Sequence, residues 1–219
     1  MTIPVIGLGA GGHAKVVIEI LQFDNQYKFV GLLDRNPELC GKTTMGLEIL
    51  GDDDQLPILM RRGVEHFFVG VGGTSDLRPR RRVYEFALSQ GMKPVSAIHP
   101  SATISPSATL GKGLTVMAGA IINAAAKLGD NVIISTGAIV EHDCVIGNHV
   151  HIATGATLGG TVRIGEGAHI GIGAVVRQSL RVGAGTVVAA GAVVVKDVPD
   201  NVTVAGVPAR ILKRAKKDA

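Results

Sequence analysis

An aliphatic residue recurs at every sixth position through the C-terminal half of this 219-residue chain. The series begins at Ile98, ends at Val194 and has seventeen members without a shift in register. A small residue such as Ala120 or Ala138 often lies four positions after the aliphatic one. A period of six fits neither an α-helix nor an alternating strand. It is the hexapeptide repeat of a parallel β-helix.

The repeat predicts a triangular prism in which about 18 residues, or three hexapeptides, form one coil. Each aliphatic side chain points inward, the small residue packs beside it, and the turns take Gly, Asn and Asp. Coils stack at the strand spacing of about 4.8 Å, which gives a prism about 25 Å tall. After the last coil, a short strand or helix following Gly206-Val-Pro-Ala-Arg210 is expected to cap the open end.

The first 95 residues have a different pattern, in which short apolar strands alternate with amphipathic helices. Strands are expected at residues 3–9, 29–34 and 66–73, and helices at 14–22 and 80–91. Such alternation predicts a small parallel α/β sheet. The sequence therefore predicts a Rossmann-like domain at 1–95 and a β-helix domain with a C-terminal cap at 96–219.

A glycine-rich turn joins the first strand to the first helix. Gly7, Gly9 and Gly12 satisfy the pattern G-x-G-x-x-G, and Asp34 ends the next strand, as in dinucleotide-binding folds. Fewer than 100 residues form only one mononucleotide half, so an NAD site does not fit. A nucleotide-linked ligand with its phosphate at the helix N-terminus fits better. A purely structural tight turn remains the alternative.

Composition and charge indicate the cellular compartment and the class of ligand. Cys40 and Cys144 are far apart and sit in no metal-binding spacing, which favours a reducing compartment. No signal peptide and no run of 18 apolar residues is found, so we expect a cytoplasmic protein without membrane insertion. The formal net charge is +4. Basic clusters at 78–82 and 210–217 are either solvated surface or attract phosphorylated ligands, and the 3% aromatic content disfavours nucleic acid.

The whole chain resembles the sialic acid O-acetyltransferase (NeuD-like) family. The resemblance rests on GAGGH at 9–13, Leu33-Asp34 and IVEHDCVIG at 139–147, and it implies that the domain at 1–95 binds a nucleotide sugar. The GVPAR ending at 206–210 resembles that of the wider bacterial hexapeptide acyltransferase family. Within the family, the chain is most similar to N-acetyltransferases acting on UDP- or GDP-linked 4-amino-4,6-dideoxy sugars. The resemblance implies a left-handed β-helix, acetyl-CoA as co-substrate without a metal, and a homotrimer with active sites between neighbouring prisms.

The resemblance also assigns roles to residues. His142 is the expected general base, and Asp143 orients it. The expected substrate-binding residues are Gly11, Gly12, His13, Asp34, Arg35, Gly72 and Gly73. The expected acetyl-CoA-binding residues are His151, Gly160, Gly173, Ala190, Lys196, Pro208 and Arg210. By charge, Lys213 and Arg214 join Arg210 as candidates for the 3′-phosphate, with simple capping of the prism as the alternative.

The repeat determines where His142 lies, and the resemblance implies its chemistry. Val140 and Cys144 point inward, so residues 141–143 lie at a turn, and Cys144 is no candidate nucleophile. Imidazole suits proton abstraction from an amine near neutral pH. Gly160 lies one coil further on, where its N–H could stabilise an oxyanion. The alternative for His142 is a solvent-exposed turn histidine.

Other function classes fit less well. A zinc enzyme would need His142, His149, His151 and His169 to converge. The repeat instead stacks His151 on His169, and His149 and His169 are expected to be ordinary surface or interface residues. A non-catalytic scaffold explains neither the N-terminal domain nor Glu141-His142-Asp143. O-acetylation of sialic acid or a related sugar hydroxyl stays open, as does the choice between UDP and GDP.

Overall fold

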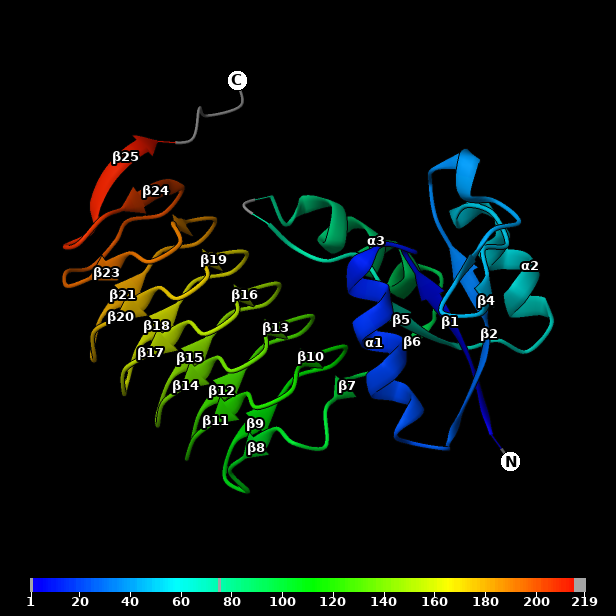
Figure 1. The fold of residues 1–219 in the computed structure, drawn as a ribbon, viewed down its shortest axis with the longest axis horizontal. Helices are drawn as coiled ribbons and strands as arrows, with labels where there is room; N and C mark the ends of the chain where they lie inside the picture. Colours follow the sequence, from blue (N-terminus) through cyan, green and yellow to red (C-terminus); the bar gives the residue numbers. More distant parts are fainter. Residues whose placement is uncertain (1, 75, 215–219) are drawn as a thin grey trace. The chain divides into compact units, whose positions relative to one another are not determined.

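The computed structural model describes residues 2–74 and 76–214, apart from the side chains of Lys213 and Arg214. The chain forms two compact units, Met1–Pro100 and Ser101–Ala219 (Figure 1). The expected fold class, an α/β region followed by a left-handed parallel β-helix, is confirmed. Within the described residues, no helix has the length and apolarity needed to cross a membrane.

The first unit is built on a four-stranded parallel sheet in the order β2-β1-β5-β6. Its strands are β1 (Ile3–Leu8), β2 (Tyr27–Leu33), β5 (His66–Val69) and β6 (Lys93–Pro94). Its helices are α1 (Gly12–Gln22), α2 (Leu56–Arg61) and α3 (Arg78–Ser89). The region between β2 and α2 also forms the hairpin β3 (Thr43–Thr44) and β4 (Leu47–Glu48) and two 3₁₀ turns, η1 (Pro37–Leu39) and η2 (Asp53–Gln55). Strand β7 (Ala97–Ile98) is near the end of the unit.

Helix α1 follows from its apolar spacing. Ala14, Val17, Ile18 and Leu21 recur at helical intervals and are buried, which gives the helix one apolar stripe. The helix begins directly after Gly11, which makes no side-chain cap hydrogen bond. Its first backbone N–H groups therefore lie at the glycine-rich turn, where the sequence predicts a phosphate.

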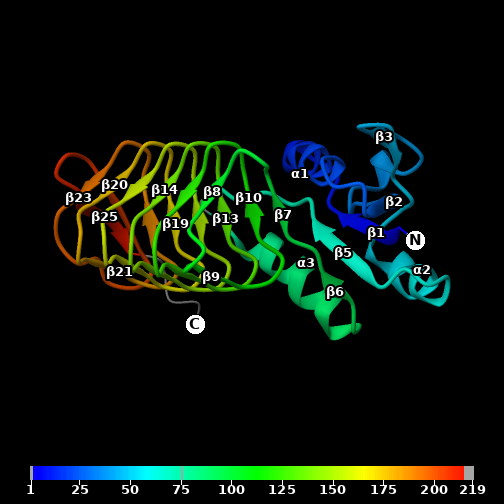
Figure 2. The same cartoon turned by 90° about the horizontal axis from the view of Figure 1, so that it is seen from below.

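The second unit is a β-helix of about six turns whose coils stack side by side (Figure 2). Three parallel sheets form its faces, and we name them by their outward side chains. The aliphatic face comprises β8 (Thr103–Ile104), β11 (Ile121–Ile122), β14 (Ile139–Val140), β17 (Thr157–Leu158), β20 (Val175–Val176) and β23 (Val193–Val194). The basic face comprises β9 (Thr109–Leu110), β12 (Lys127–Leu128), β15 (Val145–Ile146), β18 (Arg163–Ile164) and β21 (Arg181–Val182).

The third sheet, the histidine face, comprises β10 (Thr115–Val116), β13 (Ile133–Ile134), β16 (His151–Ile152), β19 (His169–Ile170) and β22 (Val187–Val188). It continues into β24 (Val202–Ala205) and β25 (Arg210–Arg214), which pair antiparallel. The C-terminal segment after the last coil is therefore a strand, one of the two forms expected.

Residues 18 apart pair across each sheet, as in the pairs Ile121–Ile139 and Ile133–His151. The repeated aliphatic residues from Val116 onward point inward and form one continuous core. The first member of the series, Ile98, is 39% exposed and is not part of this core.

The prism turns at three edges through residues with positive φ. One edge carries glycines only: Gly119, Gly137, Gly155, Gly173 and Gly191. The edge between the aliphatic and basic faces, which we call the His142 edge, carries side chains at these positions. They are Ala125, Asp143, Thr161 and Ser179, with φ between 57° and 62°. Left-handed backbone costs a residue with a Cβ about 1–2 kcal/mol, so strain is concentrated at the edge that holds His142.

Candidate active site

The centre of the candidate site is a histidine–aspartate pair on the His142 edge. Nδ1 of His142 lies 2.8 Å from Oδ2 of Asp143, and both side chains are more than half exposed. A carboxylate accepts hydrogen bonds, so this contact places the imidazole proton on Nδ1 and leaves Nε2 as an acceptor. The pair thus presents a basic nitrogen to solvent.

The next coil supplies the surface under this nitrogen. A Cβ atom placed on Gly160 would lie 2.5 Å from Nε2 of His142, so any side chain at this position would displace the ring. The carbonyl of His142 accepts a hydrogen bond from the N–H of Thr161 at 2.9 Å. The expected proximity of Gly160 to His142 is confirmed, because the two residues occupy the same position in consecutive coils.

Glu141 has a different role from Asp143. Its carboxylate accepts hydrogen bonds from the backbone N–H of His142 at 3.2 Å and from Nδ2 of Asn123 at 3.1 Å. It therefore fixes the backbone of the turn, while Asp143 contacts the ring. Asn123 was not singled out from the sequence, although its position 18 residues before Glu141 is the signal that would have found it.

Cys144 is fully buried inside the prism. Its Sγ atom donates to the carbonyl of Gly159 at 3.3 Å. Burial raises the pKa of the Cys144 thiol, because a thiolate is poorly solvated there. The structure therefore agrees with the interpretation of Cys144 as a core residue.

The remaining histidines of the prism do not converge on His142. His151 accepts or donates a hydrogen bond with Oγ of Ser135 at 2.9 Å, and its ring lies edge-on to His169 with centroids 4.9 Å apart. Burial lowers the pKa of the His169 imidazole. His149 was expected at the surface or an interface, and this is wrong. It is buried, with Nδ1 3.0 Å from Nδ2 of Asn131 one coil earlier, because its turn side chain packs along the edge.

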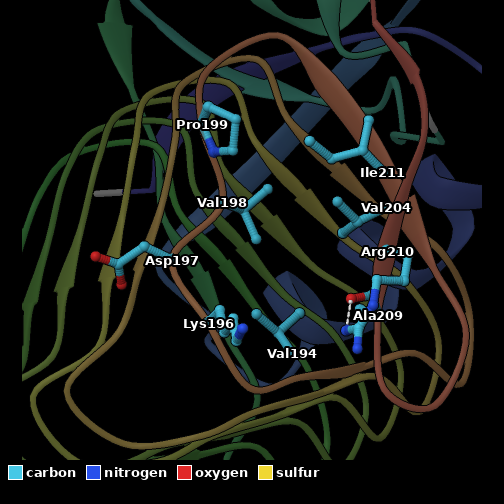
Figure 3. A pocket seen from close by; sticks show the side chains of 9 residues that line it. All are labelled: Val194, Lys196, Asp197, Val198, Pro199, Val204, Ala209, Arg210 and Ile211. Atoms are coloured by element: carbon cyan, nitrogen blue, oxygen red, sulfur yellow. Dashed lines mark hydrogen bonds between the residues drawn. The ribbon is translucent and has the colours of Figure 1, made fainter.

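A cavity of about 260 Å³ lies at the C-terminal end of the prism (Figure 3). Lys196 and Arg210 line it, together with Asp197, Pro199 and aliphatic side chains of the last coil and β25. The guanidinium of Arg210 donates to the carbonyl of Ala209 at 2.9 Å. Lys196 also lies on the His142 edge, three coils beyond His142. Pro208 is exposed just before β25, and the side chains of Lys213 and Arg214 lie outside the described residues.

The other expected acetyl-CoA residues lie elsewhere on the prism. Gly173 and Ala190 belong to the glycine edge, between the histidine and aliphatic faces, and both are exposed. His151 lies on the histidine face. Within one protomer, these residues and His142 therefore occupy separate edges and faces.

In the first unit, the expected nucleotide residues gather around the carboxyl ends of β1 and β2. Oδ2 of Asp34 accepts from the N–H of Ala10 at 2.8 Å, and Oδ1 accepts from the N–H of Asn36 at 2.9 Å. Asp34 and Arg35 also line a cavity of about 260 Å³ with Cys40 and Gln55. Arg35 forms an ion pair with Asp53 at 2.7 Å, which orients its guanidinium beside this cavity.

Gly11 directly precedes α1, Gly12 and His13 begin the helix, and the Gly72–Gly73 loop follows β5. A Cβ atom on Gly72 would lie 3.1 Å from Cβ of His13, so the loop passes directly beside this histidine. Arg80 was treated from the sequence as part of a basic cluster, yet it is 2% exposed and contacts His13. Its helical spacing to the buried residues Val83, Tyr84 and Ala87 was the signal for its burial.

Within the described part of the chain, no group of three or more His, Cys, Asp or Glu side chains is arranged to hold a metal ion.

Two family models match the chain. Residues 5–86 match the PglD N-terminal domain, and residues 125–160 match the bacterial transferase hexapeptide (six repeats). A comparison with curated proteins found no match. A Rossmann-like unit followed by a hexapeptide β-helix with a histidine–aspartate pair on one edge defines the class: a hexapeptide-repeat acetyltransferase.

Solved structures specify the family. A histidine-to-alanine variant of GDP-perosamine N-acetyltransferase from Caulobacter crescentus, in complex with CoA and GDP-perosamine, is 42% identical with a TM-score of 0.90, covering 96% of this chain and 97% of that one. The acetyltransferase domain of PglB from Neisseria gonorrhoeae FA1090, in complex with acetyl coenzyme A, is 39% identical with a TM-score of 0.84, covering 97% and 100%. WeeI from Acinetobacter baumannii AYE is 28% identical with a TM-score of 0.85, covering 96% and 100%. The chain belongs to the NeuD-like family of nucleotide-sugar acetyltransferases.

Proposed function

We propose that this enzyme transfers the acetyl group of acetyl-CoA to the amino group of a UDP- or GDP-linked 4-amino-4,6-dideoxy sugar. The observation that carries the proposal is the His142–Asp143 pair, with Nε2 of His142 held over Gly160. The similarity to an enzyme crystallised with CoA and GDP-perosamine supports the acceptor class.

The proposed mechanism is direct aminolysis of the thioester. The neutral sugar amine attacks the acetyl carbonyl, and Nε2 of His142 accepts the amine proton. The N–H of Gly160 stabilises the negative charge on the carbonyl oxygen. When the C–S bond breaks, the imidazolium returns the proton to the departing sulfur, giving the amide and CoA. Asp143 stabilises the imidazolium, and buried Cys144 takes no part.

The acyl donor would extend along the His142 edge. His142, Gly160 and Lys196 lie on this edge over three coils, about 14 Å at the usual strand spacing. The cavity lined by Lys196 and Arg210 then receives the phosphorylated end of acetyl-CoA. Arginine and lysine suit this role because both donate to phosphate oxygens.

A homotrimer would complete the site. Gly173, Ala190 and His151 lie on other parts of the prism than His142, so one molecule of acetyl-CoA reaches all of them only if a second copy contributes. A cleft between neighbouring prisms would bring the His142 edge of one copy to the histidine face or glycine edge of another.

The acceptor's nucleotide would bind to the first unit. The α1 N-terminus at Gly11, Gly12 and His13 suits the diphosphate. The cavity beside Asp34 and Arg35 suits the base or ribose, and Gly72 and Gly73 let backbone approach the ligand closely.

The test is a panel of UDP- and GDP-linked amino sugars with acetyl-CoA, including sialic acid as an O-acetylation acceptor. We expect N-acetylation of a nucleotide-linked 4-amino sugar.

His142→Asn should lower kcat by about 10²–10⁴, the usual contribution of a general base, while acetyl-CoA still binds. His66→Asn, a histidine change in β5, serves as the control. Acetylation of sialic acid alone would replace the proposed acceptor, and a His142→Asn enzyme with near-full kcat would remove His142 as the base.

A further inference from the structure

The N-terminal unit buries a cation that the mechanism above does not use. Arg80 on α3 is among the largest fully buried side chains of the chain, at 2% exposure. Burial lowers the pKa of its guanidinium to about 9, so it remains charged at neutral pH. Among the described residues, no carboxylate pairs with it, and its Nε and Nη2 atoms have no hydrogen-bond partner. Burying a charge in this way is costly, which indicates that the residue has a specific task.

The contacts of Arg80 join three segments of the unit. Its Nη1 atom donates to the carbonyl of Val71 at 2.7 Å and lies 3.3 Å from that of Val69. The same nitrogen lies 3.2 Å from Nε2 of His13. Arg80 thus ties α3 to the loop after β5 and to the first turn of α1, two of the places where the nucleotide is proposed to bind.

The contact with His13 determines the state of that imidazole. A guanidinium donates hydrogen bonds and accepts none, so Nε2 of His13 must be the acceptor. The ring is then neutral, with its proton on Nδ1.

We propose that Arg80 is a positioning residue that holds His13 as the neutral Nδ1–H tautomer, so that His13 donates a hydrogen bond to the diphosphate or sugar of the substrate. This inference rests on the proposed function for the identity of the ligand. An anionic diphosphate beside the same loops would also lower the electrostatic cost of the buried guanidinium.

The tautomer is measured by long-range ¹H–¹⁵N correlation on the ¹⁵N-labelled full-length protein, with His13 assigned from the spectrum of a His13 variant. We expect Nδ1–H in the wild type and loss of this fixed tautomer in Arg80→Met. The KM for the nucleotide sugar should rise about ten-fold or more in Arg80→Met, while the KM for acetyl-CoA stays the same. Arg81→Met is the matched control, because Arg81 is a partly exposed neighbour on α3 that pairs with Glu85.

A wild-type His13 that carries its proton on Nε2, or an Arg80→Met enzyme with an unchanged KM for the sugar, would overturn the proposal. If Arg80→Met fails to fold, His13→Asn and His13→Gln decide the question. The asparagine amide can replace an Nδ1–H donor, and the glutamine amide reaches the Nε2 position instead. We expect His13→Asn to retain more affinity for the sugar, and the reverse order would contradict the inference. A wild-type enzyme that is inactive with every acceptor of the panel would instead contradict the proposed function. The tautomer of His13 can still be determined in that case, because it is measured without substrate.

Discussion

At the scale of single residues, two histidines are held by neighbours of opposite hydrogen-bonding character. Asp143, an acceptor, bonds to Nδ1 of His142, whereas Arg80, a donor, lies against Nε2 of His13. The first ring is left with a basic nitrogen and the second with an N–H group. These arrangements suit the proton abstraction proposed for His142 and the ligand binding proposed for His13.

Asp34 is a residue whose carboxylate already has two backbone partners, Ala10 and Asn36. Asp34→Ala should raise the KM for the nucleotide sugar about ten-fold, because both loops beside the cavity lose an anchor. Asp34→Asn keeps one acceptor and should cost less. Steady-state kinetics with each substrate varied measure the effect, with Asp24→Ala at an exposed position as the control. An unchanged sugar KM would reduce Asp34 to a role in folding.

The two cysteines should differ in reactivity. Cys40 is exposed, whereas Cys144 is buried and the pKa of its thiol is raised. A raised pKa leaves less thiolate, the reactive form, so iodoacetamide should modify Cys40 alone in the folded protein and both thiols after denaturation. Mass spectrometry of the labelled protein measures this. Cys40→Ser should abolish native labelling, and fast modification of Cys144 would show that the prism opens.

At the scale of elements, two kinds of glycine serve the stack of coils. Gly165 and similar residues make room for the backbone of the next coil, because a Cβ atom there would lie 2.4 Å from the nitrogen of Ala184. Gly119 and its column instead allow a left-handed turn, with open space around the missing Cβ. A side chain at the first kind of glycine would increase the distance between coils, whereas a side chain at the second kind would strain a single φ angle.

These two roles predict different losses of stability when alanine replaces the glycine. Gly165→Ala forces two coils apart and should destabilise the β-helix by about 3 kcal/mol, at the upper end for overpacking. Gly119→Ala keeps the stack and should cost about 1 kcal/mol of left-handed strain. Urea denaturation followed by a signal from the β-helix measures both. Equal losses in the two variants would mean that coil spacing adapts more readily than the backbone distances indicate.

At the scale of the whole molecule, the aliphatic face is the candidate surface for the proposed trimer. Its outward side chains include Ile121, Ile139, Val175 and Val193, and Val175 is 40% exposed. Thr157 interrupts this row between Ile139 and Val175, but apolar side chains gathered on one face favour an interaction surface. We expect it to pack between copies in the proposed trimer, which would also bring a second copy to the His142 edge.

Val175→Arg should therefore dissociate the trimer and reduce kcat, because a buried charge without a partner is costly. Val145→Arg is the matched control: Val145 is 38% exposed on the basic face and should leave the assembly intact. Sedimentation velocity reports the mass of each variant. A wild-type protein that sediments as a monomer, or a trimeric Val175→Arg, would contradict this arrangement.

The β-helix could be predicted from the sequence in detail. Each coil repeats the same contacts at a separation of 18 residues, so the six-residue period alone predicts which side chains point inward and that Gly160 lies beside His142. The prediction was wrong for His149, whose side chain is buried at a turn of the prism. Ile98, the first member of the series, is 39% exposed and lies outside the continuous core. In the first unit, the strand–helix pattern and the glycine-rich turn were likewise visible.

The contact between His13 and Arg80 was decided by the tertiary structure. These residues are 67 positions apart, and no repeat relates them, so nothing in the local pattern indicates that they meet. In the sequence, Arg80 is one of four arginines in a basic stretch, and the packing of α3 against the sheet selects it for burial. In a periodic fold, contacting residues have the same sequence separation in every coil, so the contacts can be predicted from the sequence. A contact that a non-repeating domain makes only once depends on how its helices and loops pack in three dimensions.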